Sequence, residues 1–305
     1  MPDLAFGGQA LIEGVMMRGP SRIATAVRSP SGEIVVESRD YRSITDRRPA
    51  LKKPILRGAI AFFELLILGL SALQHSAEVA SGSHGKKSGG ISPWAMALTM
   101  VVGMGLGVLL FVYVPLQTAH WSGLAAHAFW FNLVAGAVRV TVLVGYMSLM
   151  LLSAELRRVF EYHGAEHKSI WALENGAPLS VEGARLQSRL HPRCGTSFLL
   201  IVSLLAVLLY AVSDSLVQLY LGEAPGVWLR LLTHVSLLPL VAGSSFEVLK
   251  LAGRYRDRAW VRALSAPGLW LQLITTREPS DDQLEVALRA LHEVTSEPVP
   301  VAVTA

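Results

Sequence analysis

The sequence has 305 residues, of which 52% are hydrophobic and 16% are charged, with a mean hydropathy of +0.44. Soluble globular domains carry about 25% charged residues, so this composition excludes a disordered chain, a fibrous repeat and a disulfide scaffold, and it indicates a membrane protein. The net charge is +4 and the chain has one cysteine. Because the basic residues lie between apolar runs, we interpret them as a topology signal and expect no nucleic-acid partner.

Residues 1–53 are predicted to form a cytosolic N-terminal segment that contains a β-hairpin. Residues 23–27 and 33–37 are β-prone, and a Ser-Pro-Ser-Gly turn lies between them. No charged segment followed by an apolar stretch opens the chain, so we expect no cleavable signal peptide.

Four apolar runs are long enough to cross a bilayer as helices, which needs about 20 residues. The short links inside each pair of runs contain no Lys or Arg, so the runs form two predicted transmembrane hairpins, 94–153 and 198–251. The four runs cover residues 94–118, 124–153, 198–221 and 227–251.

A fifth apolar run, residues 55–73, is shorter and contains Glu64. If only the four longer runs cross and both termini are cytoplasmic, 25 of the 27 Lys and Arg residues lie on the inner side. We therefore predict a re-entrant or interfacial helix at 54–80 and a cytosolic linker at 81–93. The predicted fold class is a mainly α, polytopic helical membrane protein with four spanning helices, one re-entrant or interfacial helix and a small cytosolic β-hairpin portion. We expect the protein to lie in the bacterial inner membrane.

The last predicted unit is a cytosolic C-terminal segment, residues 252–305, with a helix at 281–293. Ser280 is its expected N-cap, and Gln283 stands at the capping-box position. An apolar stripe along this helix should pack on the rest of the cytosolic portion. The stripe consists of Leu284, Ala287, Leu288 and Leu291.

The cytosolic connection at 154–197 opens as a predicted continuation of the second span and contains the motif H-x-x-E-H. On a helix, His163 and His167 face the same side and can bind one metal ion, while Glu166 could deprotonate or orient a water molecule on that ion. This order of residues is that of inverted zincins. We therefore expect a divalent metal, Zn²⁺ above others, with Glu166 as general base.

A helix-borne histidine pair needs one or two further ligands. His191 and Cys194, at H-x-x-C spacing, are the nearest candidates, and Glu161 is a third. Gly164, inside the motif, costs a helix about 1 kcal/mol relative to alanine. Two other interpretations stay open: an amphipathic helix whose polar residues face water, and a metal-free acid–base site.

Further polar residues lie elsewhere in the chain. Glu13 and Arg18, in a glycine-rich stretch, form either a buried structural pair or part of the catalytic site. Arg139, Asp214 and Glu247 lie in or beside predicted spans, where polar groups are costly and face the bundle or a cavity.

Four motifs in order resemble the YqhQ-like family of uncharacterised bacterial membrane proteins, and the resemblance covers essentially the whole chain. The family is commonly described as predicted metal-dependent enzymes, so the resemblance implies a metal site and hydrolytic chemistry. It implies a site made of Glu161, His163, Glu166, His167, His191 and Cys194, with Glu13 and Arg18 as neighbours. The motifs are GGQALIEGVMMRGP (7–20), EYHGAEHK (161–168), HPRCGTSF (191–198) and PGLWLQ with TTREP (267–272 and 275–279).

We therefore expect a membrane-embedded metal-dependent enzyme, a hydrolase with a peptidase-like motif, whose site lies at the cytoplasmic membrane face. Its substrate could be a membrane-protein segment, a lipid headgroup or a cytosolic molecule, and the sequence does not choose among them. A transporter or channel is one alternative. A non-catalytic scaffold with a structural metal is the other, and four protein ligands would favour it.

Overall fold

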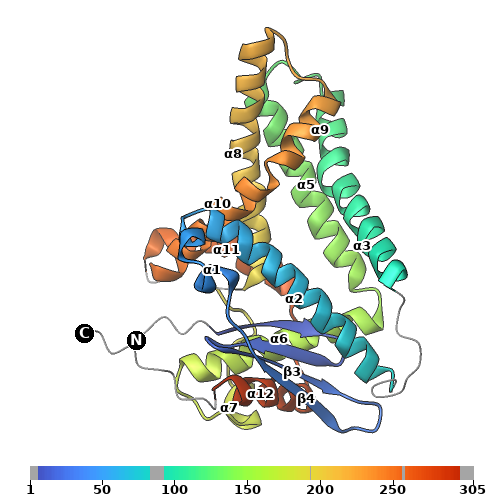
Figure 1. Cartoon of the computed structure of the whole chain (residues 1–305), viewed down its shortest axis with the longest axis vertical. Helices are drawn as coiled ribbons and strands as arrows, with labels where there is room; N and C mark the ends of the chain where they lie inside the picture. Colours follow the sequence, from blue (N-terminus) through green and yellow to red (C-terminus); the bar gives the residue numbers. More distant parts are fainter. Residues whose placement is uncertain (1–5, 83–92, 193, 256–257, 296–305) are drawn as a thin grey trace.

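The structure is a computed structural model, which describes residues 6–82, 93–192, 194–255 and 258–295. In Figure 1 a bundle of long helices rises from a base that contains a small sheet and shorter helices. The predicted fold class is confirmed, because the described part of the chain is a mainly helical membrane protein with one small sheet near its N-terminus. Most of the predicted 81–93 linker lies outside the described residues.

The N-terminal segment forms an antiparallel sheet in the order β1-β2-β3-β4. The predicted hairpin is confirmed, because β3 and β4 pair with Val27 opposite Val35. The pattern does not predict the other hairpin, β1–β2, whose glycines indicate only a closely packed backbone. The strands are β1 (Gly7–Leu11), β2 (Gly14–Arg18), β3 (Arg22–Arg28) and β4 (Ile34–Asp40).

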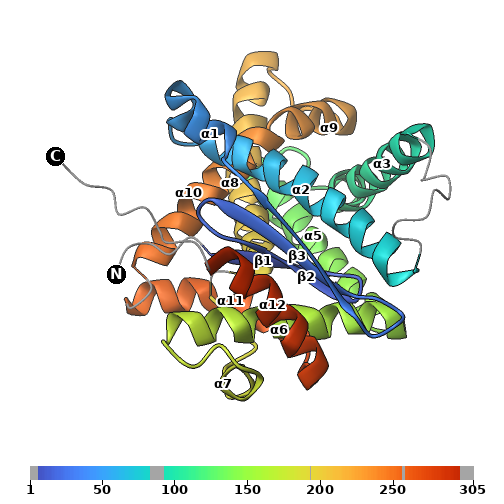
Figure 2. The same cartoon turned by 60° about the horizontal axis from the view of Figure 1, so that its bottom comes forward.

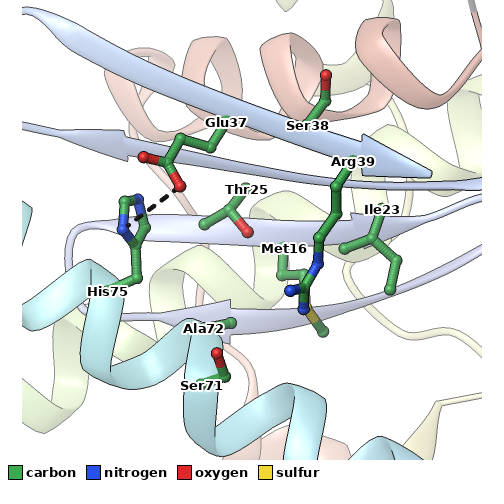
Figure 3. A pocket seen from close by; sticks show the side chains of 9 residues that line it. All are labelled: Met16, Ile23, Thr25, Glu37, Ser38, Arg39, Ser71, Ala72 and His75. Atoms are coloured by element: carbon green, nitrogen blue, oxygen red, sulfur yellow. Dashed lines mark ion pairs between the residues drawn. The ribbon is translucent and has the colours of Figure 1, made fainter. Parts of the chain in front are cut away.

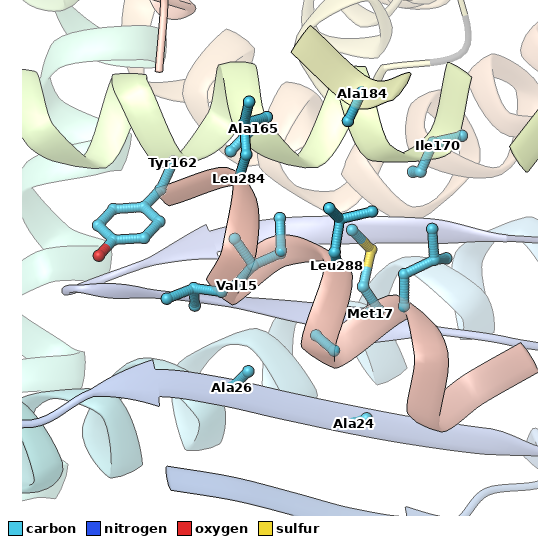
Figure 4. Packing of buried hydrophobic residues seen from close by; sticks show 14 of the residues in the cluster. Val15, Met17, Ala24, Ala26, Tyr162, Ala165, Ile170, Ala184, Leu284 and Leu288 are labelled. Carbon is cyan, nitrogen blue, oxygen red and sulfur yellow. The ribbon is translucent and has the colours of Figure 1, made fainter. Parts of the chain in front are cut away.

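One face of the sheet is covered by α6 (Ala154–Glu174) and α12 (Asp281–Thr295), as Figure 2 shows from below. Alternation along β2 turns Val15 toward these helices, where it belongs to the same buried cluster as Leu288 of α12 (Figure 4). This cluster is the core of the base, and it joins three segments that lie far apart in the sequence.

The predicted C-terminal helix is confirmed as α12. The backbone N–H of Ser280 donates to Oε1 of Gln283 at 2.8 Å, which is the expected capping box. All four residues of the predicted apolar stripe are buried. The other elements of the base and its edge are the short α1 (Ile44–Arg47), 3₁₀ turn η1 (Pro49–Lys52) and α7 (Val181–Arg185), and the longer α11 (Ala259–Thr275).

Helix α2 (Leu56–Ala80) lies obliquely between the bundle and the other face of the sheet (Figure 1). The backbone N–H of Ile12, in the β1–β2 turn, donates to Oγ of Ser76 on α2 at 3.3 Å. A cavity of about 230 Å³ remains between α2 and the sheet, where Nδ1 of His75 lies 3.6 Å from a carboxylate oxygen of Glu37 (Figure 3). These contacts with the sheet fit the interfacial helix of the predicted fold class.

Within the described residues, four helical segments are long and apolar enough to cross a membrane, and a helix pair bent by 50° is a further candidate. The first three of the four predicted spans match single helical segments, and the fourth matches the bent pair. The one further segment that is long and apolar enough is α2. Pro239 explains the bend, because it lacks an N–H and its ring clashes with the preceding turn. The segments are α2, Ala97–Trp121, α5 (Ala128–Met150) and Leu199–Leu221 of α8 (Gly195–Leu221), and the bent pair is α9 (Val227–Ser236) with α10 (Leu238–Arg254).

The first spanning segment contains a π-helical turn, η2 (Leu109–Tyr113), between α3 (Pro93–Val108) and α4 (Val114–Trp121). Pro115 lies two residues after the turn and has no backbone N–H to donate. The widened turn therefore accommodates the proline within an otherwise continuous helix.

Helix α6 is a separate element, so the predicted continuation of the second span is wrong. The chain leaves helical conformation after α5, and Oγ of Ser153 caps the new helix by accepting from the backbone N–H of Leu156 at 3.4 Å. Because of this break, α6 runs along the base beneath the bundle (Figure 2), and the H-x-x-E-H motif lies next to the sheet.

Four polar residues form a buried group inside the helix bundle, which we call the intramembrane cluster. One carboxylate oxygen of Asp214 lies 2.8 Å from Nδ2 of Asn132 and 3.0 Å from Nε of Arg230. Its other oxygen lies 3.1 Å from Nε2 of His234. These groups thus find partners within the protein rather than in lipid.

Candidate metal cluster at the base of the bundle

Three ligand-forming side chains converge where α6 meets the start of α8. His163 and His167, one helical turn apart, face the same side of α6, and Cys194 is the N-cap residue of α8. Their donor atoms all lie within 4.8 Å of one another, and Nε2 of His163 is 3.2 Å from Sγ of Cys194. We call these three residues the candidate metal cluster.

Backbone carbonyls hold both imidazole rings from behind. Nδ1 of His163 lies 2.7 Å from the carbonyl oxygen of Thr275, and Nδ1 of His167 lies 2.5 Å from that of Arg189. A carbonyl only accepts, so each Nδ1 carries a proton, and in a neutral ring the lone pair is then on Nε2. Metal-binding histidines are usually oriented in this way.

The Nε2 atoms point into the interior of the base. Nε2 of His167 is buried and has no hydrogen-bond partner among the described residues. Burial also lowers the pKa of His167, which favours the neutral form that binds metals. Tetrahedral zinc distances of about 2.0–2.3 Å place neighbouring ligand atoms about 3.3–3.8 Å apart, so the donor set of this cluster fits a zinc ion.

Gly164 lets a loop reach the cluster. A Cβ at this position would lie 2.0 Å from the carbonyl oxygen of Arg277, which stands two residues after Thr275, the last residue of α11. The backbone N–H of Arg277 donates to the carbonyl of Phe160 at 2.8 Å, so the loop is anchored to α6. The glycine that weakens the helix is therefore needed to bring Thr275 to His163.

Glu166 lies beside the two imidazoles. Its Oε2 is 3.8 Å from Nε2 of His163 and 3.7 Å from Nε2 of His167. Gly8 of β1 approaches so closely that a Cβ there would lie 2.7 Å from Cγ of Glu166. Burial raises the pKa of Glu166, and the charges of His163 and His191 together with a backbone hydrogen bond from Gly8 only partly offset this effect. A carboxyl group in this setting can hold or accept a proton.

His191 is adjacent to the cluster, but its Nε2 lies 3.5 Å from Oε1 of Glu174. Its ring is 5.7 Å from that of His167, centroid to centroid, and it lies outside the group of three converging donors. Gln272 of α11 holds the backbone of His191 through two hydrogen bonds of 2.8 Å. His191 therefore borders the cluster and positions the segment that leads to Cys194.

The other predicted site residues lie apart from the converging donors. Oε2 of Glu161 accepts from Nε2 of Gln283 on α12 at 2.9 Å. Glu13 does not pair with Arg18: it makes a bidentate ion pair with Arg158 of α6, with both distances at 2.5 Å. The guanidinium of Arg18 instead lies 4.8 Å from the ring centroid of Tyr41.

Several positioning residues could not be assigned from their types alone. The carbonyls of Thr275 and Arg189 contribute backbone atoms, which carry no side-chain signal, and Gln272 acts on the backbone of His191. Gln272 and Thr275 lie in the family motifs at 267–272 and 275–279, which do not reveal what these residues do, and Arg189 lies outside all four motifs.

Comparison with known proteins agrees with the resemblance seen in the motifs. Residues 53–297 match the model of a family described as protein of unknown function (DUF1385). The chain is 35% identical over 304 residues to the uncharacterized protein YqhQ of Bacillus subtilis, covering 95% of this chain and 92% of that protein. No solved structure matches. The chain therefore belongs to the DUF1385 family of YqhQ-like proteins.

Proposed function

We propose that the chain is a membrane-embedded metal-dependent enzyme, a hydrolase whose site is the candidate metal cluster at the cytoplasmic membrane face. The observation that carries this proposal is the anchoring of both Nδ1 atoms by carbonyls, which directs two Nε2 atoms and Sγ of Cys194 toward one another. A helix whose polar residues merely faced water would not need these anchors, and His167 is 1% exposed.

In this proposal His163, His167 and Cys194 bind a divalent ion, with Zn²⁺ preferred for its affinity for imidazole and thiolate. When bound, such an ion supplies Lewis acidity that makes water a better nucleophile near neutral pH. Glu166 takes or holds a proton at its carboxylate, 3.7 Å from the nearer Nε2. Burial of the cluster excludes bulk water from these groups.

Three converging protein ligands favour catalysis over a structural role. Structural zinc sites are closed by four protein ligands, whereas catalytic sites use three and keep a position for water or substrate. Among the described residues the converging group has three members. The charged groups that motivate a transporter have partners at separate places: Asp214 lies in the intramembrane cluster, and Glu247 pairs with Arg57 of α2.

Metal analysis of the purified protein tests the proposal. We expect about one zinc per chain in the wild type, and loss of the metal in His163→Ala and His167→Ala. His120→Ala is the matched control, because His120 is exposed at the end of α4 and should leave the zinc content unchanged. A wild type without metal, purified without chelators, would overturn the proposal.

For topology, we propose the bacterial inner membrane with both termini in the cytoplasm. The placement of 25 of 27 basic residues beside the predicted inner ends of the spans supports this orientation. Cysteines replacing Ser31, in the β3–β4 turn, and Ser122, after α4, test it with a membrane-impermeant maleimide. Ser122→Cys should react in intact cells and Ser31→Cys only after permeabilisation, whereas the opposite result would invert the topology.

A further inference from the structure

An apolar pocket lies among the helices of the bundle. It has a volume of about 580 Å³ and is bounded by α5, α8, α10 and α11. This volume is in the range of small-molecule sites, which is about 300–1,000 Å³. Of its lining residues only Ser203 has a polar side chain, and its hydroxyl donates to the carbonyl of Leu199 at 3.0 Å. The pocket therefore suits hydrocarbon.

The pocket opens sideways between two spanning helices. Leu133 of α5 and Leu204 of α8 both line it, and they are 40% and 55% exposed. Surfaces of this kind on spanning segments face the hydrocarbon core of the bilayer. The lipid around the protein is therefore the most abundant hydrocarbon that can enter.

The inner end of the pocket belongs to the same segment as the metal ligands. Pro192 lines the pocket and stands two residues before Cys194. Gly268 of α11 lines it as well, and Gln272, one turn further along α11, binds the backbone of His191. The pocket wall and the candidate metal cluster thus share one continuous piece of structure.

A positive charge stands on one of the helices that bound the pocket. Lys250 is exposed and follows the pocket residue Leu249 directly on α10. Basic residues at the cytoplasmic surface attract anionic lipid headgroups, at about 1 kcal/mol per charge. The apolar wall and this charge together match a phospholipid better than a spanning protein segment.

We propose that this pocket binds one acyl chain of a membrane phospholipid and so holds the polar end of that lipid beside the candidate metal cluster. A lipid thereby becomes the substrate class of the site. Only that assignment rests on the proposed function, because acyl-chain binding depends on the pocket alone.

Photocrosslinking in nanodiscs tests the proposal. The probe is phosphatidylglycerol with a diazirine in one acyl chain, in a phosphatidylethanolamine and phosphatidylglycerol bilayer, and labelled peptides are mapped by mass spectrometry. We expect labelling to concentrate on residues 133–140 and 200–207. Ala137→Trp, which fills the pocket from α5, should lower this labelling about tenfold, a loss of about 1.4 kcal/mol in binding.

The matched control is Ala97→Trp, the same substitution at an exposed position of the first spanning segment, away from the pocket. It should leave the labelling pattern and its intensity unchanged. Even labelling of all exposed helix faces, unaffected by Ala137→Trp, would overturn the proposal. Occupation by a second copy of the chain, detected as protein–protein crosslinks through these residues, would overturn it too.

Zinc content measured on the same samples separates the two proposals. Pocket labelling without bound zinc would overturn the metal-dependent function and leave the acyl-chain site standing. Zinc in both tryptophan variants without pocket labelling in the wild type would overturn the acyl-chain site alone.

Discussion

Asp214 and Glu166 are both buried carboxylates beside histidines, and their surroundings differ. Asp214, inside the bundle, has the guanidinium of Arg230, an amide nitrogen and an imidazole nitrogen within 3.1 Å. Glu166, in the base, has two imidazole nitrogens at 3.7 and 3.8 Å. Both oxygens of Asp214 therefore have close polar partners. Glu166 instead lies beside the donor atoms of the candidate metal cluster, which face one another.

The difference in partners is the basis on which different roles are proposed for the two carboxylates. A buried charge with a full set of partners stabilises the fold as long as the set stays complete. A buried carboxyl without a cationic partner costs stability, and such groups concentrate at functional sites. The comparison therefore favours a structural role for the intramembrane cluster, and it is one reason why the proposed function gives the chemical role to Glu166.

Neutralising Asp214 should have the largest effect. Asp214→Asn leaves Arg230 buried without its counter-charge, so we expect the free energy of unfolding in detergent micelles to fall by about 3–5 kcal/mol. The zinc content of the folded protein should not change, because the candidate metal cluster lies in the base. Ser215→Ala, at the next position of α8, which is exposed, is the control. Its free energy of unfolding should stay within about 0.5 kcal/mol of that of the wild type. Unchanged stability in Asp214→Asn would contradict the structural role.

Gly164→Ala comes next, and here two effects oppose each other. Helix propensity alone predicts a gain of about 1 kcal/mol, but the new Cβ would lie 2.0 Å from a backbone oxygen of the anchoring loop. We expect the steric clash to be the larger effect, so that the free energy of unfolding falls by about 1–3 kcal/mol and zinc occupancy decreases. Gly145→Ala on α5, where a Cβ would meet nothing within 4 Å, is the matched control. A stabilised Gly164→Ala variant with full zinc would refute the role of the loop.

Glu166→Gln is the counterpart of Asp214→Asn, and it should change the free energy of unfolding in the opposite direction. Because the substitution removes a buried charge that lacks a cationic partner, the free energy of unfolding of the metal-free protein should rise by about 0.5–2 kcal/mol. Zinc binding should persist, since Glu166 is outside the converging donors. Chemical denaturation with and without chelator measures both effects. A loss of stability as large as that of Asp214→Asn would remove the contrast between the two carboxylates.

The smallest effect concerns the ion pair of Glu13 and Arg158, which is partly exposed. Arg158→Ala should lower the free energy of unfolding by about 0.2–1 kcal/mol. The hydrogen bonds and charge of Arg158 hold the pKa of Glu13 below its ordinary value of 4.5. The contribution of the pair is therefore present above pH 4.5 and is lost as the pH falls further. Stability curves of wild type and variant should converge in acid; curves that stay parallel would show that the pair contributes no charge-dependent stability.

Local patterns were sufficient for the elements whose signals are local. Alternation and a turn predict β3–β4, the capping box predicts α12, and helical spacing brings His163 and His167 to one face. Apolar length predicts the spans, including the bent pair.

Contacts between distant segments were not predictable in the same way. The partner of Glu13 is 145 residues away, and the oxygen that requires Gly164 belongs to a loop after α11. His191 has suitable chemistry and spacing, yet its Nε2 faces Glu174 because tertiary packing decides where the ring lies. The types of the side chains thus predicted the region of the candidate site. Which of those side chains converge could be determined only from the folded structure.

X-ray absorption at the zinc edge of the purified wild type tests the central claim most directly. Two imidazoles and one thiolate predict one sulfur neighbour at about 2.3 Å and nitrogen or oxygen neighbours at about 2.0–2.1 Å. Cys194→Ser should remove the sulfur shell while the imidazole signal stays. A spectrum without sulfur in the wild type, or a protein that binds no zinc, would contradict the account.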